Sequence, residues 1–293
     1  MPIAGGEDTC VYRFHAASSA VPQVLCVLPP QQSMASLTRM RMIVSALSTA
    51  GVKTPQYLRI CADEALFGGL AAVMDFIEGL PLEFGNIGHA RLLGQFHAEL
   101  HSRDVSSVIN TLDAHHLPRE QWLSPDTIHR CLFRWSQNHP WLKPVIDWMD
   151  DNFDLDQDLA ICHGDFRPNN IFVRNSELVG IVDWNFGIAP AVFDVGFTLT
   201  GMEILTRDRS PQCTEAQSRE ANRVYLNSYC EFSGLTHSQI ERHQVFSAVH
   251  FLLGALYSNL SSLKHPAVIC DLRTLIGSLT GLHLRGPGDD SQS

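Results

Sequence analysis

The sequence predicts an α+β fold, with short strands near the amino terminus and helices over most of the remainder. Short apolar strands separated by turns occur near the amino terminus, and segments with helical spacing of apolar residues dominate the remainder. The chain has 293 residues, of which 45% are hydrophobic and 18% charged. That length and composition are typical of a globular protein with enough apolar surface for two packed lobes.

The first predicted elements are two strands and a helix. Gly5 and Gly6 predict a turn that leads into a strand at residues 10–14, and residues 23–28 predict the next strand. Apolar residues at helical spacing then predict a helix over residues 36–50, which ends at a glycine.

Helices are predicted for most of the later sequence. Leucine and phenylalanine side chains on one face predict a helix around residues 92–100, with His97 and His101 near the edges of that face. Histidines in such positions are more often structural than metal-binding. The apolar stretch at residues 245–257 is too short to span a bilayer and predicts a buried helix.

A hairpin in the middle of the chain brings polar residues together. Residues 159–162 are predicted to form an apolar strand that enters a polar loop, and residues 171–173 to form the strand that leaves it. The chain then reverses at a polar turn and returns as residues 178–182. We expect this hairpin to deliver Asp183 to the side of Asn170.

The loop itself, residues 163–170, reads His-Gly-Asp-Phe-Arg-Pro-Asn-Asn, and Asp183 is followed by a tryptophan. In phosphoryl transfer of the kinase type, a carboxylate orients the attacking hydroxyl, while an amide and a second carboxylate hold Mg²⁺. Asp165, Asn170 and Asp183 occur in that order, and their hard oxygen donors suit Mg²⁺. Singly, Asp and Asn are common turn formers, and His163 could be an ordinary loop histidine. Together, between two apolar strands, these residues favour a kinase-like site.

This combination resembles the aminoglycoside phosphotransferase and choline kinase family, whose signature is His-Gly-Asp, four variable residues and Asn, followed by Asp-Trp after a hairpin. The resemblance implies a protein-kinase-like fold of two lobes, a small lobe built on an antiparallel sheet and a larger, mainly helical lobe. It also implies an N-lobe at residues 1–74, a hinge at residues 75–79, a C-lobe at residues 80–285 and a disordered tail at residues 286–293.

The family likeness implies roles for individual residues. Asp165 and Arg167 are expected to be catalytic, with Asp165 orienting the acceptor hydroxyl and Arg167 lying near the transferred phosphate or the acceptor. His163 and Asp194 are expected to support the loop. Contacts to the nucleotide, ATP or GTP, are expected from five residues: Gly5, Gly6, Arg13, Asp75 and Ile77.

The sequence departs from the family pattern in the small lobe. Members normally carry a Lys or Arg on the third strand and a Glu on the following helix, and alignment puts Cys26 and Met40 at those positions. Loss of both partners is electrostatically consistent, because loss of one alone would leave an unpaired charge in the cleft. Arg13 is the best candidate for a compensating base, with Arg39 or Arg41 available if the register is shifted.

Charge and cysteine usage limit the partners. No basic tract is present, so nucleic acid is not an expected partner, and neither is a membrane. The net charge of the chain is −10, and residues 1–73 carry +1, so the remaining residues carry −11. An acidic larger part of the chain suits a cationic small-molecule substrate. Eight cysteines without a Cys-x-x-Cys pair, and no evident secretory signal, indicate the cytoplasm.

Two functions are compatible with these features. The first is a Mg²⁺-dependent kinase that transfers the γ-phosphoryl group of ATP or GTP to a hydroxyl of an antibiotic, amino sugar or amino alcohol, in antibiotic resistance or natural-product metabolism. The second is a kinase-fold protein that sequesters a small molecule or performs other chemistry in its cleft. The retained metal ligands favour the enzyme. Neither the acceptor nor the oligomeric state can be predicted from the sequence.

Overall fold

The computed structural model describes residues 2–3, 9–17, 21–29, 31–117, 124–210, 212–257 and 266–284. The chain divides into two compact units, each assembled from separate stretches of sequence. Unit 1 comprises residues 1–81, 104–118 and 171–184, and unit 2 comprises residues 82–103, 119–170 and 185–293. The contiguous lobe boundaries given above stay predictions, and the predicted tail lies outside the described residues.

Unit 1 contains a five-stranded antiparallel sheet in the order β1-β2-β3-β5-β4. Its strands are β1 (Pro2–Ile3), β2 (Cys10–Phe14), β3 (Gln23–Val27), β4 (Tyr57–Cys61) and β5 (Ala71–Asp75). The two strands predicted near the amino terminus are therefore confirmed, and they pair with each other directly. Three strands that the sequence pattern did not reveal complete the sheet.

One face of this sheet is covered by helix α1 (Met34–Thr49), which confirms the helix predicted for residues 36–50 within two residues at each end. The side chain of Ser33 accepts a hydrogen bond from the amide of Ser36 at 3.1 Å and so caps the first turn. Leu37 of α1 packs with Leu70 and Ala72 in a buried cluster. A short helix, α2 (Glu64–Phe67), connects β4 to β5.

A second sheet of unit 1 holds the predicted hairpin. Its strands are β6 (Leu80–Pro81), β8 (Ile171–Arg174) and β9 (Glu177–Ile181), in the order β6-β8-β9. Asn175 and Ser176 make the turn between β8 and β9 with φ values of 52° and 63°. Helix α4 (Val105–Ala114) packs against α1 in the same unit.

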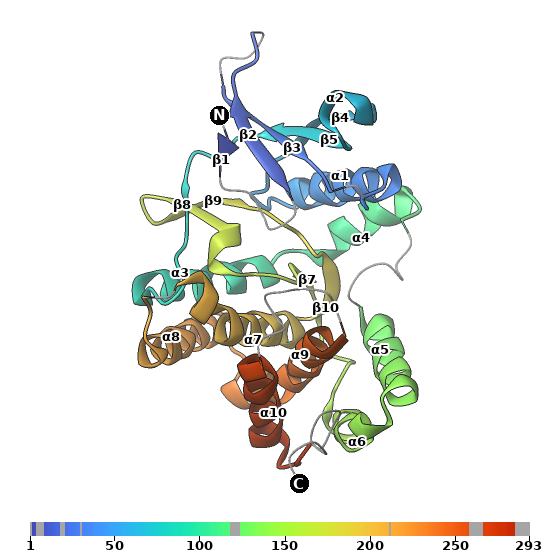
Figure 1. Ribbon diagram of the computed structural model, residues 1–293, viewed down its shortest axis with the longest axis vertical. Coiled ribbons are helices and arrows are strands. Elements are labelled where there is room, and N and C mark those ends of the chain that lie inside the picture. Colours follow the sequence, from blue (N-terminus) through green and yellow to red (C-terminus); the bar gives the residue numbers. More distant parts are fainter. Residues whose placement is uncertain are drawn as a thin grey trace. The chain divides into compact units, whose positions relative to one another are not determined.

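Unit 2 is mainly helical around one two-stranded antiparallel sheet, β7 (Leu159–Cys162) and β10 (Gly187–Pro190). Helix α3 (Ile87–His101) packs along α8 (Glu215–Ser233), and α7 (Ala191–Arg209) packs along α9 (His237–Tyr257) (Figure 1). The other helices in the described part of this unit are α5 (Pro125–Asn138), η2 (Pro140–Leu142), α6 (Lys143–Asn152), η3 (Pro168–Asn170) and α10 (Pro266–Thr280). The two-lobed α+β composition matches the predicted fold class.

Helix α9 confirms the prediction of a buried helix at residues 245–257. Its inward side includes Val245, Phe246 and Leu252, each at most 2% exposed. None of the helices in the described part of the chain is long and apolar enough to cross a membrane.

Candidate active site

The loop at residues 163–170 leaves β7 in unit 2 through a tight turn. Cys162 pairs with Gly187 of β10, and the carbonyl of His163 accepts a hydrogen bond from the amide of Asn185 at 2.9 Å. Gly164 has a φ of +78°, and a Cβ atom there would lie 2.6 Å from the carbonyl oxygen of Asn185. Only glycine fits this conformation and this close approach. The glycine of the motif therefore sets the direction in which Asp165 leaves the strand.

Asp165, Arg167 and Asn170 form a compact polar cluster in this loop. The Nη2 atom of Arg167 donates to Oδ2 of Asp165 at 2.5 Å, and the two side chains are 17% and 18% exposed. The Nδ2 atom of Asn170 donates to the same Oδ2 at 3.1 Å and to the Asp165 carbonyl at 2.9 Å. A partly enclosed carboxylate with two fixed donors is held in one orientation.

Asn170, only 3% exposed, can offer a ligand atom to a cation. Both of its hydrogen bonds to Asp165 use the amide nitrogen, so the amide oxygen is directed away from that carboxylate. An amide oxygen is a hard donor of the kind that Mg²⁺ accepts. The loop thus fixes the side chain of Asn170 with its amide nitrogen on Asp165 and its amide oxygen turned away from that residue.

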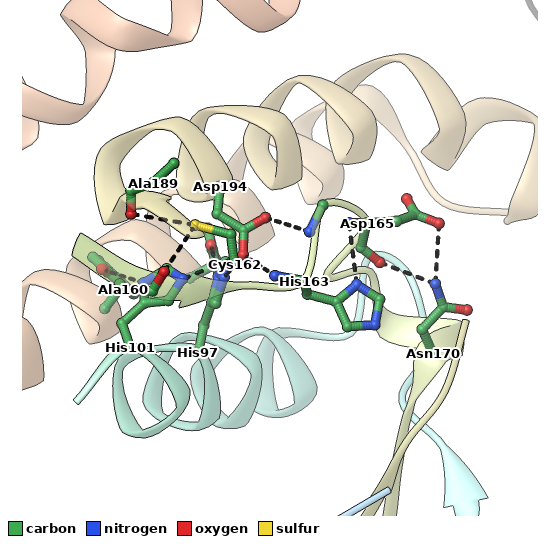
Figure 2. A network of polar contacts seen from close by, with 12 residues as sticks. His97, His101, Ala160, Cys162, His163, Asp165, Asn170, Ala189 and Asp194 are labelled. Atoms are coloured by element: carbon green, nitrogen blue, oxygen red, sulfur yellow. Dashed lines mark hydrogen bonds and ion pairs between the residues drawn. The ribbon is translucent and has the colours of Figure 1, made fainter. Parts of the chain in front are cut away.

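A buried carboxylate, that of Asp194 at the start of α7, holds the loop backbone (Figure 2). Its Oδ2 atom accepts from the amide of His163 at 2.6 Å, and its Oδ1 atom accepts from the amide of Gly164 at 2.8 Å. His163 in turn accepts the amide of Asp165 on Nδ1 at 3.1 Å. These contacts are those expected if His163 and Asp194 support the loop.

Two histidines of α3 supply the remaining hydrogen bonds to Asp194. The Nε2 atoms of His97 and His101 lie 3.0 and 3.2 Å from Oδ2. Burial alone would raise the pKa of Asp194, but hydrogen bonds from His101 and His97 outweigh it and hold that pKa well below its usual range. Burial lowers the pKa of His97 to about 3, with His101 adding to the effect. His97 is therefore a neutral ring that donates from Nε2.

Two tyrosines of α8 fix the histidine rings. Tyr225 and Tyr229 place their hydroxyl oxygens 2.7 Å from Nδ1 of His97 and of His101, respectively. Since each Nε2 faces the Asp194 carboxylate as a donor, each Nδ1 is the acceptor of the tyrosine proton. Both hydroxyl groups are buried, and burial raises the pKa of each tyrosine far above its usual value. Neither tyrosine was predicted from the sequence to belong to the site.

His97, His101 and Asp194 could in principle hold a metal ion, because their ligand atoms lie within 4.8 Å of one another. Oδ2 of Asp194 already accepts a backbone amide at 2.6 Å, and each ring nitrogen that faces it carries a proton. A cation would have to displace all of these hydrogen bonds. The cluster is therefore a hydrogen-bond network that positions the loop.

The last residue predicted to bind metal, Asp183, lies in unit 1 just beyond β9. It is exposed and has a φ of 62°, a conformation that non-glycine residues rarely adopt. Neighbouring residues are held firmly: Trp184 donates through Nε1 to Oγ1 of Thr54 at 3.2 Å, and Ile181 donates to the carbonyl of Lys53 at 2.8 Å. The strained backbone thus sits between two anchored positions.

The residues predicted to contact the nucleotide differ in the contacts that they make. Asp75 accepts the amide of Gln56 at 3.1 Å, and Ile77 packs where a Cβ on Gly180 of β9 would lie. The guanidinium of Arg13 stacks over the ring of Phe76 at 4.4 Å. Gly5 and Gly6 lie outside the described residues.

Comparisons with known proteins agree with these features. The chain matches the Phosphotransferase enzyme family (APH) over residues 1–231. Homoserine kinase from Brucella canis is 23% identical over 269 residues, which cover 87% of this chain and 78% of that protein. Ethanolamine kinase from Plasmodium vivax has a TM-score of 0.60 at 11% identity, covering 96% of this chain and 82% of that one.

A second solved structure is a thermostable mutant of an aminoglycoside phosphotransferase in a ternary complex with ADP and hygromycin B. It has a TM-score of 0.59 at 14% identity, and the match covers 96% of this chain and 92% of that one. These structural likenesses confirm the protein-kinase-like fold. Because the family match spans residues 1–231 of a 293-residue chain, the protein belongs to the phosphotransferase enzyme family.

Proposed function

We propose that this protein is a Mg²⁺-dependent kinase that transfers the γ-phosphoryl group of ATP to a hydroxyl of a small molecule. The observation that carries the proposal is the arrangement of Asp165, Arg167 and Asn170 on a loop whose backbone is fixed by the buried Asp194. Positioning and charge stabilisation supply most of the rate in phosphoryl transfer, and a rigid loop provides both.

Asp165 is the residue that orients the acceptor hydroxyl and accepts its proton. Arg167 holds this carboxylate in the absence of substrate and supplies a positive charge for the transferred phosphoryl group. The Nε atom of Arg167 is buried without a hydrogen-bond partner among the described residues. That donor gains a partner if Arg167 turns toward a phosphate oxygen, which favours this role.

Asn170 and Asp183 are the proposed ligands of Mg²⁺. Their donors, one amide oxygen and one carboxylate, fit a hard cation that completes its shell with water and phosphate oxygens. When bound, the ion neutralises charge on the phosphates. Asn170 is held by Asp165, and the backbone at Asp183 is held by its neighbours, so both ligands are ordered by the chain itself.

ATP is the proposed phosphoryl donor, and the segment with Asp75 and Ile77 is proposed to hold its base. An aminoglycoside phosphotransferase of the same fold was solved with ADP. GTP, the other nucleotide considered from the sequence, gains no support from the comparisons. Arg13 is engaged with Phe76, so its proposed role at the nucleotide requires it to leave that ring.

The proposed acceptor is a small hydroxyl compound that also carries an amine, in keeping with the acidic remainder of the chain. Homoserine kinase, ethanolamine kinase and the complex with hygromycin B all concern molecules of this kind. Antibiotic resistance and natural-product metabolism are both compatible settings. All eight cysteines are free thiols, which favours a reducing cytoplasm.

One observation favours the second candidate, a kinase-fold protein that binds a ligand without phosphorylating it. Cys26, at the position where the family carries a base, lies 4.0 Å from the sulfur of Met74, and burial raises the pKa of its thiol to about 11. A neutral thiol cannot balance phosphate charge. Nucleotide binding therefore depends on other groups. The kinase proposal is correct only if those groups bind the nucleotide phosphates without this base.

A ligand screen by mass spectrometry separates these candidates. The protein is incubated with Mg²⁺, ATP and pools of amino alcohols, amino acids and aminoglycosides, and products are searched for the mass gain of one phosphoryl group. We expect one pool to show it, and Asp165→Ala to abolish it while ATP binding by calorimetry stays within about twofold of the unsubstituted protein. Saturable binding of a pool member with no product in any pool would favour the second candidate.

A further inference from the structure

Tyr57, the first residue of β4, carries a hydroxyl group with no hydrogen-bond partner among the described residues, and its side chain is partly buried. Buried tyrosine hydroxyls normally find a partner. The Tyr57 oxygen is not one of the fully enclosed polar atoms that lack a partner, so it remains reachable from solvent. A tyrosine hydroxyl that solvent can reach, at the end of a partly buried ring, can donate to a ligand, as tyrosine hydroxyls do in ligand pockets.

The ring of Tyr57 lies on the same face of the sheet as Cys26. Tyr57 is opposite Met74 in the β4–β5 ladder, and the sulfur of Met74 lies 4.0 Å from that of Cys26. Tyr57 and Met74 both pack against the cluster around Ala72, which is directly opposite Cys26 in the β3–β5 ladder. Tyr57 thus approaches the position at which the family resemblance expects a basic residue.

The segment that precedes Tyr57 is also bound to the chain around Asp183. Thr54 accepts a hydrogen bond from Trp184, and the carbonyl of Lys53 accepts one from the amide of Ile181. Burial raises the pKa of Tyr57 to about 12, and both Cys26 and Asp183 add to the rise. The hydroxyl therefore lies within electrostatic reach of Asp183 and stays protonated at neutral pH.

We propose that the Tyr57 hydroxyl donates a hydrogen bond to a phosphate oxygen of the bound nucleotide, beside Asp183, and so fulfils without charge part of the role of the missing base. A neutral donor needs no acidic partner, which agrees with methionine at position 40. A lysine in this place would instead need a counter-charge or a shifted pKa. The inference rests on the proposed function, because it requires that the protein bind a nucleotide.

Calorimetric titration of the full chain tests this role with two ligands, ADP plus Mg²⁺ and adenosine. Tyr57→Phe removes only the hydroxyl and keeps the ring. We expect it to weaken ADP binding about tenfold, the effect of losing one hydrogen bond to a charged acceptor, and to leave adenosine binding unchanged. Tyr257→Phe, at an exposed tyrosine of α9, serves as the matched control and is expected to bind both ligands like the unsubstituted protein.

Three outcomes would overturn the inference, and they differ in what else they affect. Unchanged ADP affinity in Tyr57→Phe would remove the role of the hydroxyl while leaving the kinase proposal intact. Equal losses of ADP and adenosine affinity would show that Tyr57 shapes the base pocket and does not contact phosphate. Failure of the unsubstituted protein to bind ADP at millimolar concentration would refute the proposed function itself.

Discussion

Replacing Asp194 with asparagine tests how the catalytic loop is held. The substitution keeps the volume of the side chain but exchanges one acceptor oxygen for an NH₂ donor. The carboxylate is fully buried and accepts four hydrogen bonds, two from loop amides and two from histidine rings. An asparagine at this position must therefore point its NH₂ group at another donor.

The size of the effect follows from these contacts. A buried hydrogen bond to a charged acceptor contributes about 1.5–3 kcal/mol, and a donor left unpaired costs about 1–3 kcal/mol. If the amide nitrogen takes the place of Oδ1, only the Gly164 amide loses its acceptor, while the other three donors keep a weaker, neutral one. We therefore expect Asp194→Asn to lower the free energy of unfolding by about 3–5 kcal/mol. We also expect kcat to fall about 10²-fold, because Asp165 directly follows Gly164 and a shift of about 1 Å is enough for such a loss.

Urea denaturation followed by tryptophan fluorescence measures the first quantity. Asp147→Asn is the matched control, since Asp147 is an exposed aspartate of α6 that pairs with Lys143 at 2.7 Å. Exposed pairs at this helical spacing contribute about 0.5 kcal/mol. If the free energy of unfolding of Asp194→Asn lies within about 1 kcal/mol of that of the unsubstituted protein, the four hydrogen bonds do not hold the loop.

Two further predictions concern metal and pH. Asp183→Asn is expected to remove the Mg²⁺-dependent part of ATP binding in calorimetry, because an amide replaces the charged ligand, and an unchanged Mg²⁺ dependence would exclude Asp183 as a ligand. His97 has a pKa of about 3 in the folded protein against about 6.5 in an unfolded chain, so below pH 6.5 the unfolded state binds a proton that the folded state does not. Stability should therefore fall with acidification, by about 2 kcal/mol at pH 5 from this group alone. His97→Gln should flatten the dependence of the urea midpoint on pH, whereas His237→Gln, at an exposed histidine, should leave it unchanged. If His97→Gln and the unsubstituted protein lose stability equally steeply on acidification, His97 is not the group responsible.

The parts of the fold that the sequence predicted correctly depend on local patterns. The hairpin of β8 and β9 follows from two apolar strands around a polar turn, and α1 follows from helical spacing of apolar residues that ends at a glycine. The loop between β7 and β8 is short enough that the order of Asp165, Arg167 and Asn170 already implied their proximity. Local sequence determined these features because few other chain paths satisfy them.

The support of the loop could not be predicted, because it is built from residues far apart in sequence. Tyr225 and Tyr229 lie 128 positions beyond His97 and His101, and β7 pairs with β10 across the hairpin. One signal was present: both pairs have a spacing of four, which places each pair on one face of a helix. No local sequence pattern indicates that these two helix faces meet. The network is therefore seen only in the packing of α3 on α8.

The network around Asp194 also bears on whether the protein is an active enzyme. Burying a carboxylate costs several kcal/mol, and replacing buried charged groups by apolar side chains of similar volume is often neutral or stabilising in proteins. Four donors directed at one buried charge are thus a costly way to gain stability but an effective way to fix a backbone. Their effect is to position the amides that precede Asp165, which matters only if the placement of that carboxylate matters. A protein that merely sequesters a ligand would have no need for such placement, so Asp194→Asn should reduce turnover far more than it reduces ligand affinity.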